Sequence, residues 1–199
     1  RTRTMILRGS LIAVLVVVGG VATLVRSIKV VEAGEVGLVY RFGDITGQRD
    51  AGLAVIFPWE EFKTADIRIQ KVRAEGECSN GLDECLEAFS SETQDVFVVA
   101  TANISVNPDD VQNLYRNVGP NYVDKLVRPR LLQIFKDETV KYKSVDIAPN
   151  REKIRAQVRD RMRGELADFS INVDDLLIDN LDFRPEFKQA IEAKQIASQ

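Results

Sequence analysis

Hydrophobic residues form one long uninterrupted run near the N-terminus of the chain and recur in short, periodic groups through the rest. The run, residues 9–25, holds 17 residues without a charge, between Arg8 and Arg26. A helix of that length spans roughly 25 Å, close to the ~30 Å hydrocarbon thickness of a bilayer. We therefore predict a single-pass membrane anchor within residues 1–27. A signal peptide cleaved after Val31-Glu32-Ala33 and a buried core helix are the alternatives.

Short β-type segments separated by turn residues follow the anchor up to about residue 89. Segments 28–31, 36–42 and 62–72 suit strands, which predicts a small antiparallel β-domain over residues 28–89. Residues 53–59, L-A-V-I-F-P-W, have two interpretations. They form a buried strand that ends at Pro58, or a loop whose Ile56, Phe57 and Trp59 enter the near membrane leaflet, where Trp is favoured.

A second unit is predicted over residues 90–183. It begins with a long strand at 96–106, rich in Val, Phe, Thr and Ile. Helices follow up to residue 167, and Pro129 is expected to kink or divide one of them. A strand at 173–183 closes the unit. The order β-α-α-α-β-α indicates an α+β fold.

Residues 184–199 read as the start of a long C-terminal helix or coiled coil. Pro185 suits a first helical turn, strong helix formers follow, and no Gly or Pro ends the pattern before Gln199. The apolar face of this helix is expected to be narrow and rich in alanine. An isolated helix of ~15 residues has only marginal stability in water. Such a helix needs a partner, which favours assembly over a pocket. Ala190, Ala193 and Ala197 would let neighbouring copies pack closely.

The predicted helix at 151–167 combines a narrow apolar stripe with many arginines, and the strand after it is acidic. The simpler interpretation is a solvated helix face beside an acidic strand edge. The alternative is charge complementarity between subunits, basic face to acidic edge, which would set the register of an assembly. The residues concerned are Arg151, Arg155, Arg159, Arg163, Asp174, Asp175 and Asp179.

Cys78 and Cys85 flank Asn80-Gly81, a strong hairpin-turn signal. A turn there can bring the two cysteines within bonding distance, so a disulfide forms in an oxidising compartment, and two free thiols are the alternative. Their spacing matches no common metal motif.

The composition excludes several function classes. The 199 residues carry a net charge of −3 and no histidine, which argues against nucleic-acid binding and against a zinc or iron site. Most general-base and triad chemistry also requires histidine, which leaves carboxylate and Ser-Lys mechanisms open. The sequence has no G-x-S-x-G or S-x-x-K motif, so we expect neither an enzyme nor a cofactor.

The charges that flank the anchor predict its orientation. Arg1, Arg3 and Arg8 precede the apolar run, whereas Arg26 and Lys29 follow it. The excess of cations on the N-terminal side places the N-terminus inside and the bulk of the chain on the exported side.

Several segments resemble the SPFH family, named for stomatin, prohibitin, flotillin and the HflK/HflC pair, and are most similar to prohibitin-like proteins. Residues 186–195, E-F-K-Q-A-I-E-A-K-Q, are similar to the end of that domain. Residues 31–43, which contain A-G-E-V-G-L-V-Y-R-F-G, and 52–59 resemble its opening, and V-R-P-R at 127–130 its middle. Residues 76–89 with their two cysteines depart from the prohibitin pattern.

The resemblance implies an SPFH or band-7 fold and an assembly scaffold rather than an enzyme. Such proteins form large homo-oligomeric or hetero-oligomeric rings or cages on a membrane, organise lipid microdomains and are implicated in enclosing FtsH-type AAA proteases. The expected location is then the bacterial inner membrane, on its periplasmic side, or the mitochondrial inner membrane. The alternative is a non-polymerising adaptor or inhibitor of a membrane protease.

Overall fold

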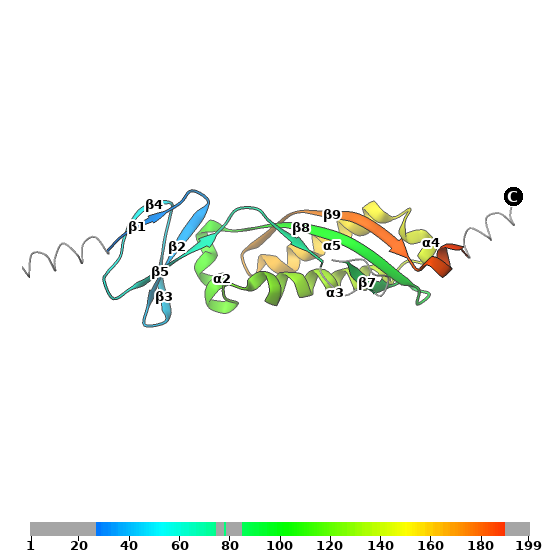
Figure 1. Ribbon diagram of the computed structural model, residues 1–199, viewed down its shortest axis with the longest axis horizontal. Helices are drawn as coiled ribbons and strands as arrows, with labels where there is room; N and C mark the ends of the chain where they lie inside the picture. Colours follow the sequence, from blue (N-terminus) through cyan, green and yellow to red (C-terminus); the bar gives the residue numbers. More distant parts are fainter. Residues whose placement is uncertain (1–26, 75–77, 79–84, 190–199) are drawn as a thin grey trace, which may run out of the picture. The chain divides into compact units, whose positions relative to one another are not determined.

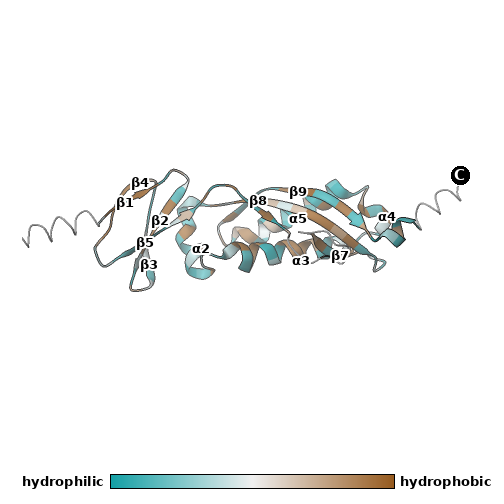
Figure 2. Ribbon diagram, in the orientation of Figure 1, coloured by the Kyte–Doolittle hydropathy of each residue, from teal (hydrophilic) through white to brown (hydrophobic). Residues whose placement is uncertain are grey.

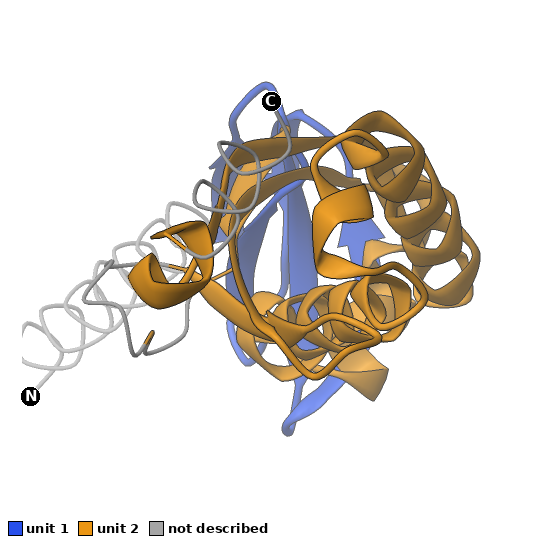
Figure 3. Ribbon diagram, turned by 90° about the vertical axis from the view of Figure 1, so that its right-hand side faces the viewer, with its two compact units in different colours: residues 1–67 blue, residues 68–199 orange. Residues whose placement is uncertain are grey.

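The computed structural model describes residues 27–74, 78 and 85–189. The chain divides into two compact units, residues 1–67 and 68–199 (Figure 3). Within the described residues no helix is both long and apolar enough to cross a membrane. The anchor expected from residues 9–25 lies outside the described part of the chain.

Unit 1 is built from five short strands in two small antiparallel sheets (Figure 1). A two-stranded ribbon pairs β1 with β4, and a three-stranded sheet has the order β3-β2-β5. The strands are β1 (Ile28–Val31), β2 (Glu35–Arg41), β3 (Asp44–Arg49), β4 (Gly52–Val55) and β5 (Glu61–Asp66).

The core of unit 1 is centred on β2, where four consecutive residues from Val36 are buried. Gly37 is one of them, and a Cβ atom at that position would lie 2.3 Å from the Phe62 ring. Glycine is therefore required there because the aromatic side chain of β5 packs directly on the backbone of β2.

Unit 2 is an antiparallel sheet covered on one face by helices α3 (Arg128–Thr139) and α5 (Arg151–Ala167) (orange, Figure 3). Its central strand β8 is apolar along most of its length (Figure 2) and pairs with β9 on one side and with both β6 and β7 on the other. The strands are β6 (Gln70–Arg73), β7 (Leu86–Phe89), β8 (Asp95–Val106) and β9 (Ile171–Phe183).

The boundary between the units differs from the sequence prediction. We expected residues 28–89 to form the first domain, but β6 and β7 pair with β8 and so belong to unit 2. The boundary therefore lies between Ile67 and Arg68, and the segment 62–72 is two strands in different sheets rather than one.

Local caps and breaks define the helices of unit 2, including the break expected at Pro129. The Asn107 side chain accepts a hydrogen bond from Asp109 N at 3.1 Å before the short turn η1, and Gly119 ends α2 with a φ of 96°. Pro129 divides the next helical segment into a π-helical turn and α3, because proline donates no backbone N–H. The elements are η1 (Pro108–Asp110), α2 (Val111–Asn117), η2 (Val123–Val127), α3 (Arg128–Thr139), α4 (Ser144–Ile147) and α5 (Arg151–Ala167).

The apolar stripe of α5 fills the space between β9 and α3. Its members are fully buried, at most 1% exposed, and recur every four residues, as the sequence predicted: Ile154, Val158, Met162 and Leu166. The sheet, α3 and α5 thus share one core and hold the arginine-rich side of α5 beside β9.

Candidate membrane and assembly surfaces

The ribbon of β1 and β4 leaves the apolar side chains of one face in solvent. Ile28 pairs with Val55 and Val30 pairs with Leu53, and all four side chains are between 54% and 79% exposed. Of the alternate residues of the same strands, Val31 and Ala54 are buried and Lys29 is half-buried. Because successive side chains of a strand point to opposite faces, the ribbon has two apolar faces, of which only one is covered.

The turn that follows β4 extends this apolar face with two aromatic rings. Phe57 and Trp59 stack in parallel, with ring centroids 4.9 Å apart and an interplanar angle of 5°, and both are more than half exposed. We call the six exposed side chains the apolar surface: Ile28, Val30, Leu53, Val55, Phe57 and Trp59. Contiguous apolar exposure of this kind marks a site of contact with another apolar phase or partner.

Ile56 does not belong to the apolar surface. It was expected, together with Phe57 and Trp59, to enter a membrane, but its side chain is only 6% exposed. Its backbone N–H donates to Ser27 O at 2.8 Å, which continues the pairing of β1 with β4 and turns the side chain to the buried face. The burial of Ile56 therefore contradicts the membrane-dipping role that the sequence predicted for it.

Glu60 holds the aromatic turn in place. Its Oε2 accepts a hydrogen bond from Phe57 N at 2.9 Å, and its backbone N–H returns one to Phe57 O at 3.0 Å. Its Oε1 accepts from Arg41 Nη2 at 2.7 Å, so the turn is tied to the end of β2. The bond from Phe57 N, followed by that from Arg41, lowers the pKa of Glu60, which keeps this carboxylate ionised.

A cleft of about 360 Å³ lies beside the turn. Its lining combines apolar side chains with one ammonium group and two carboxyl groups: Lys29, Ile56, Phe57, Pro58, Glu60, Glu61 and Phe62. Within the described residues, no group of three or more Asp, Glu, Cys or His side chains is placed to hold a metal ion.

Three arginines of α5 donate to backbone carbonyl oxygens of β9. Arg163 donates from Nε to Val173 O at 2.7 Å and from Nη2 to Asp174 O at 2.9 Å. Arg155 donates from Nη1 to Leu176 O at 3.2 Å, and Arg151 donates to Ile178 O. Among the described strands β9 pairs with β8 alone, so it is an edge strand, and these arginines occupy polar backbone groups along it.

The charged side chains also pair within the chain. Arg155 Nη1 lies 3.2 Å from Asp175 Oδ1, and the hydrogen bond to Glu152, with the charge of Asp175, raises the pKa of Arg155. Arg159 pairs with its neighbour Asp160, and Asp179 accepts from the Thr101 hydroxyl at 2.9 Å. The structure thus places most of the charged residues expected at a subunit interface in contacts inside one chain.

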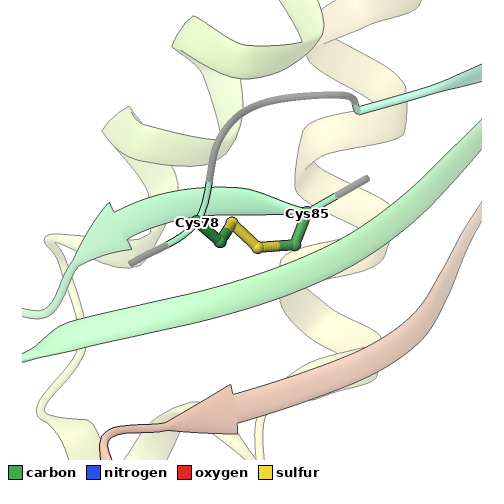
Figure 4. Close-up of a disulfide and its surroundings, with 2 residues drawn as sticks. All are labelled: Cys78 and Cys85. Atoms are coloured by element: carbon green, nitrogen blue, oxygen red, sulfur yellow. A yellow bond between two sulfur atoms is a disulfide. The ribbon is translucent and has the colours of Figure 1, made fainter. Parts of the chain in front are cut away.

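Cys78 and Cys85 are joined by a disulfide bond, with their Cα atoms 6.0 Å apart (Figure 4). Cys85 is fully buried immediately before β7, and β6 ends five residues before Cys78. β6 and β7 both pair with the same side of β8, one after the other along its length. The disulfide therefore cross-links the segment that connects these two strands.

The first turn of the C-terminal helix is fixed to the ends of β8 and β9. Arg184 pairs with Asp95 and Lys188 with Asp182, and the rings of Phe183 and Phe187 lie 5.5 Å apart. Burial opposes ionisation of Asp182, but the bonds from Lys188 and from Phe183 N lower its pKa overall. Ala190, Ala193 and Ala197 lie outside the described residues.

Comparison with known proteins shows the family of the chain. A model of the SPFH domain / Band 7 family matches residues 29–199, which is most of the chain. The chain belongs to the SPFH domain / Band 7 family. Prohibitin-2 of Saccharomyces cerevisiae is 27% identical over 186 residues, and prohibitin-2 of Dictyostelium discoideum is 29% identical over 188 residues. These alignments cover 91% and 93% of this SPFH chain, but only 56% and 61% of the two relatives.

A third relative is the mitochondrial prohibitin complex protein 1 of Caenorhabditis elegans, 26% identical over 110 residues. That alignment covers 55% of this chain and 40% of the relative. The SPFH chain therefore spans about half the length of the curated prohibitins that it resembles.

Proposed function

We propose that this SPFH-domain chain is the membrane-bound base of an oligomeric scaffold. The observation that carries the proposal is the apolar surface of unit 1, which begins at Ile28, three residues after the uncharged run 9–25. If that run is the anchor, the exposed face of the β1–β4 ribbon lies close to the membrane surface, because the ribbon begins three residues after the run. The exposed Trp59 suits the boundary between lipid and water.

Lipid contact is tested by fluorescence of Trp59, the single tryptophan of the 199 residues. In the chain reconstituted into liposomes, we expect brominated lipids to quench Trp59. Replacing Leu53 and Val55 together by serine removes roughly 2–4 kcal/mol of favourable apolar burial and should reduce that quenching.

The control replaces two exposed apolar residues of unit 2, Val140 and Val145, by serine. This pair should leave the quenching of Trp59 unchanged. An unquenched Trp59 in the unmodified chain would contradict the membrane contact itself, whatever the variants do.

Assembly is the second part of the proposal. Its support is family membership, the name of the nematode relative as a complex protein, and the helix that leaves unit 2 after Phe183 with its first turn fixed by two ion pairs. We infer that many copies form a ring or cage whose wall is the continued helix, with Ala190, Ala193 and Ala197 at helix contacts. In such an assembly the membrane enclosed by the ring is an organised microdomain.

The finer proposals concern location and client. The disulfide suits an oxidising compartment, and with the N-terminal excess of cations it favours an exported SPFH domain, on a bacterial inner membrane or in mitochondria. An FtsH-type AAA protease is the proposed client, enclosed or regulated by the scaffold.

The size of the detergent-extracted full-length protein tests assembly. We expect very large particles by mass photometry and negative-stain electron microscopy. A monomer or dimer would exclude the scaffold and favour a non-polymerising adaptor of a membrane protease. Quantitative pull-down separates the same two possibilities, because a cage captures the protease with a large excess of this chain, and an adaptor with about one copy per protease subunit.

A further inference from the structure

Phe42 occupies a position that is unfavourable for phenylalanine in two ways. Arg41 pairs with Asp44, so Phe42 and Gly43 form a two-residue turn between β2 and β3. Both have positive φ angles, 52° and 90°, as in a type I′ turn. That turn favours Asn-Gly, because the left-handed conformation strains a residue with a bulky side chain.

The Phe42 ring gains no compensating burial within the chain, because it is 92% exposed. A strained backbone position that carries a fully exposed aromatic ring indicates a contact made outside the molecule. The question is then which partner the ring meets.

The strand register places Phe42 at the same end of unit 1 as the aromatic turn. Tyr40 of β2 pairs with Glu61 of β5, so the residues just after Tyr40 lie beside those just before Glu61. The ion pair from Arg41 to Glu60 joins the two turns directly. The pair Ile28 and Val55 is the end of the β1–β4 ribbon nearest this turn. Phe57 lies two residues after Val55, and the expected anchor precedes Ile28 in the sequence.

We propose that Phe42 is a third aromatic contact with the lipid bilayer, and that this end of unit 1 points into the membrane interface. The inference rests on the proposed membrane function and adds an orientation to it. We choose a bilayer as the partner because Phe42 lies at the same end of unit 1 as the aromatic turn, and Ile28 follows the expected anchor by three residues. Arg41 and Asp44, on either side of the Phe42-Gly43 turn, suit the headgroup layer, so the contact is shallow.

Moving the single tryptophan tests the orientation. The variant Phe42→Trp with Trp59→Phe, reconstituted into liposomes, should be quenched strongly by lipids brominated near the headgroup and weakly by lipids brominated near the chain ends. The matched control is Ala51→Trp with Trp59→Phe. Ala51 is exposed and precedes the Gly52–Val31 pair at the opposite end of the β1–β4 ribbon, so its tryptophan should stay unquenched.

The outcomes separate this inference from the function on which it rests. An unquenched Trp at position 42 beside a quenched native Trp59 would overturn the contact of Phe42 and leave the membrane function standing. An unquenched native Trp59 would overturn both. Equal quenching at positions 42 and 51 would show that unit 1 lies flat on the bilayer, which contradicts the proposed orientation.

A substitution that suits the turn removes misfolding as an explanation. Phe42→Asn places the preferred Asn-Gly sequence at the type I′ turn, so the hairpin is retained while the ring is lost. We expect a loss of Trp59 quenching by the shallow brominated lipid, with an unchanged circular dichroism spectrum. Quenching equal to that of the unmodified chain would contradict a role of Phe42 in the contact.

Discussion

Replacing Arg155 and Arg163 together by alanine is expected to lower the free energy of unfolding of unit 2 by roughly 2–3 kcal/mol. A hydrogen bond from a charged donor contributes about 1.5–3 kcal/mol, and the partial exposure of both side chains reduces the expected loss for the pair below the simple sum. The loss arises because Val173 O, Asp174 O and Leu176 O lose donors that α5 holds in place. Urea unfolding of the detergent-solubilised chain, followed by circular dichroism, measures it.

Arg159→Ala is the matched control on the same helix. Arg159 pairs with its neighbour Asp160, a contact whose carboxylate is largely exposed, so the expected loss is within about 0.5 kcal/mol. Dissociated particles at unchanged unfolding free energy in the Arg155 and Arg163 double variant would contradict the intrachain role. That result would restore the interpretation that these arginines join subunits.

The arginines show what a charge pattern leaves open. The sequence places a basic helix before an acidic strand, and that pattern favours contact between the two without saying whether they belong to one chain or to neighbours. The structure adds the return of α5 along β9 and the backbone carbonyl groups that accept from Arg155 and Arg163. Every residue has a backbone carbonyl group, so no residue type in the sequence indicates which carbonyl oxygens accept from these arginines. The sequence therefore suggested only the acidic side chains as their partners.

The aromatic turn was partly predictable. Trp59 beside a proline and near an expected anchor indicates a membrane interface, but the face on which each neighbouring side chain lies depends on strand register. One shift of register exchanges the two faces, and the bond from Ile56 N to Ser27 O decides that Ile56 is buried. The same register exposes Ile28, Val30 and Leu53, which the alternating pattern identifies as strand residues but does not assign to the outside.

Long-range pairing explains the misplaced domain boundary. The segments at 28–31, 96–106 and 151–167 could be predicted because their periodicity and caps are local. The short strand Gln70–Arg73 pairs with residues of β8 that lie about thirty positions further along the chain. No local pattern in the strand itself indicates that partner. A β-type pattern at residues 70–73 is equally compatible with either unit. The prediction that residues 28–89 form one continuous domain was therefore wrong.

Reduction of the disulfide between Cys78 and Cys85 is expected to lower the free energy of unfolding of unit 2 by about 2–3 kcal/mol, the chain-entropy value for a loop as short as seven residues of separation. The bond lies between two strands of the sheet of unit 2, so we expect its loss to lower the stability of that sheet. Val72 of β6 and Leu86 of β7 pair with Ala102 and Val98 on the same side of β8, and the bond restricts the connection between them in the unfolded chain.

Reduction is a cleaner change than substitution, because Cys85 is fully buried and its replacement would also remove packing atoms. Urea unfolding with and without dithiothreitol gives the difference, and thiol labelling in denaturant verifies which form was measured. The variant with both Cys78 and Cys85 replaced by alanine is the control, since dithiothreitol should not change its midpoint. A reduced chain with two free thiols and an unchanged midpoint would show that β8 holds β6 and β7 without the bond. Conversely, a fall in the free energy of unfolding that dithiothreitol causes only in the unmodified chain assigns that fall to the disulfide. This bond lies in residues 76–89, the segment where the chain departs from the prohibitin pattern.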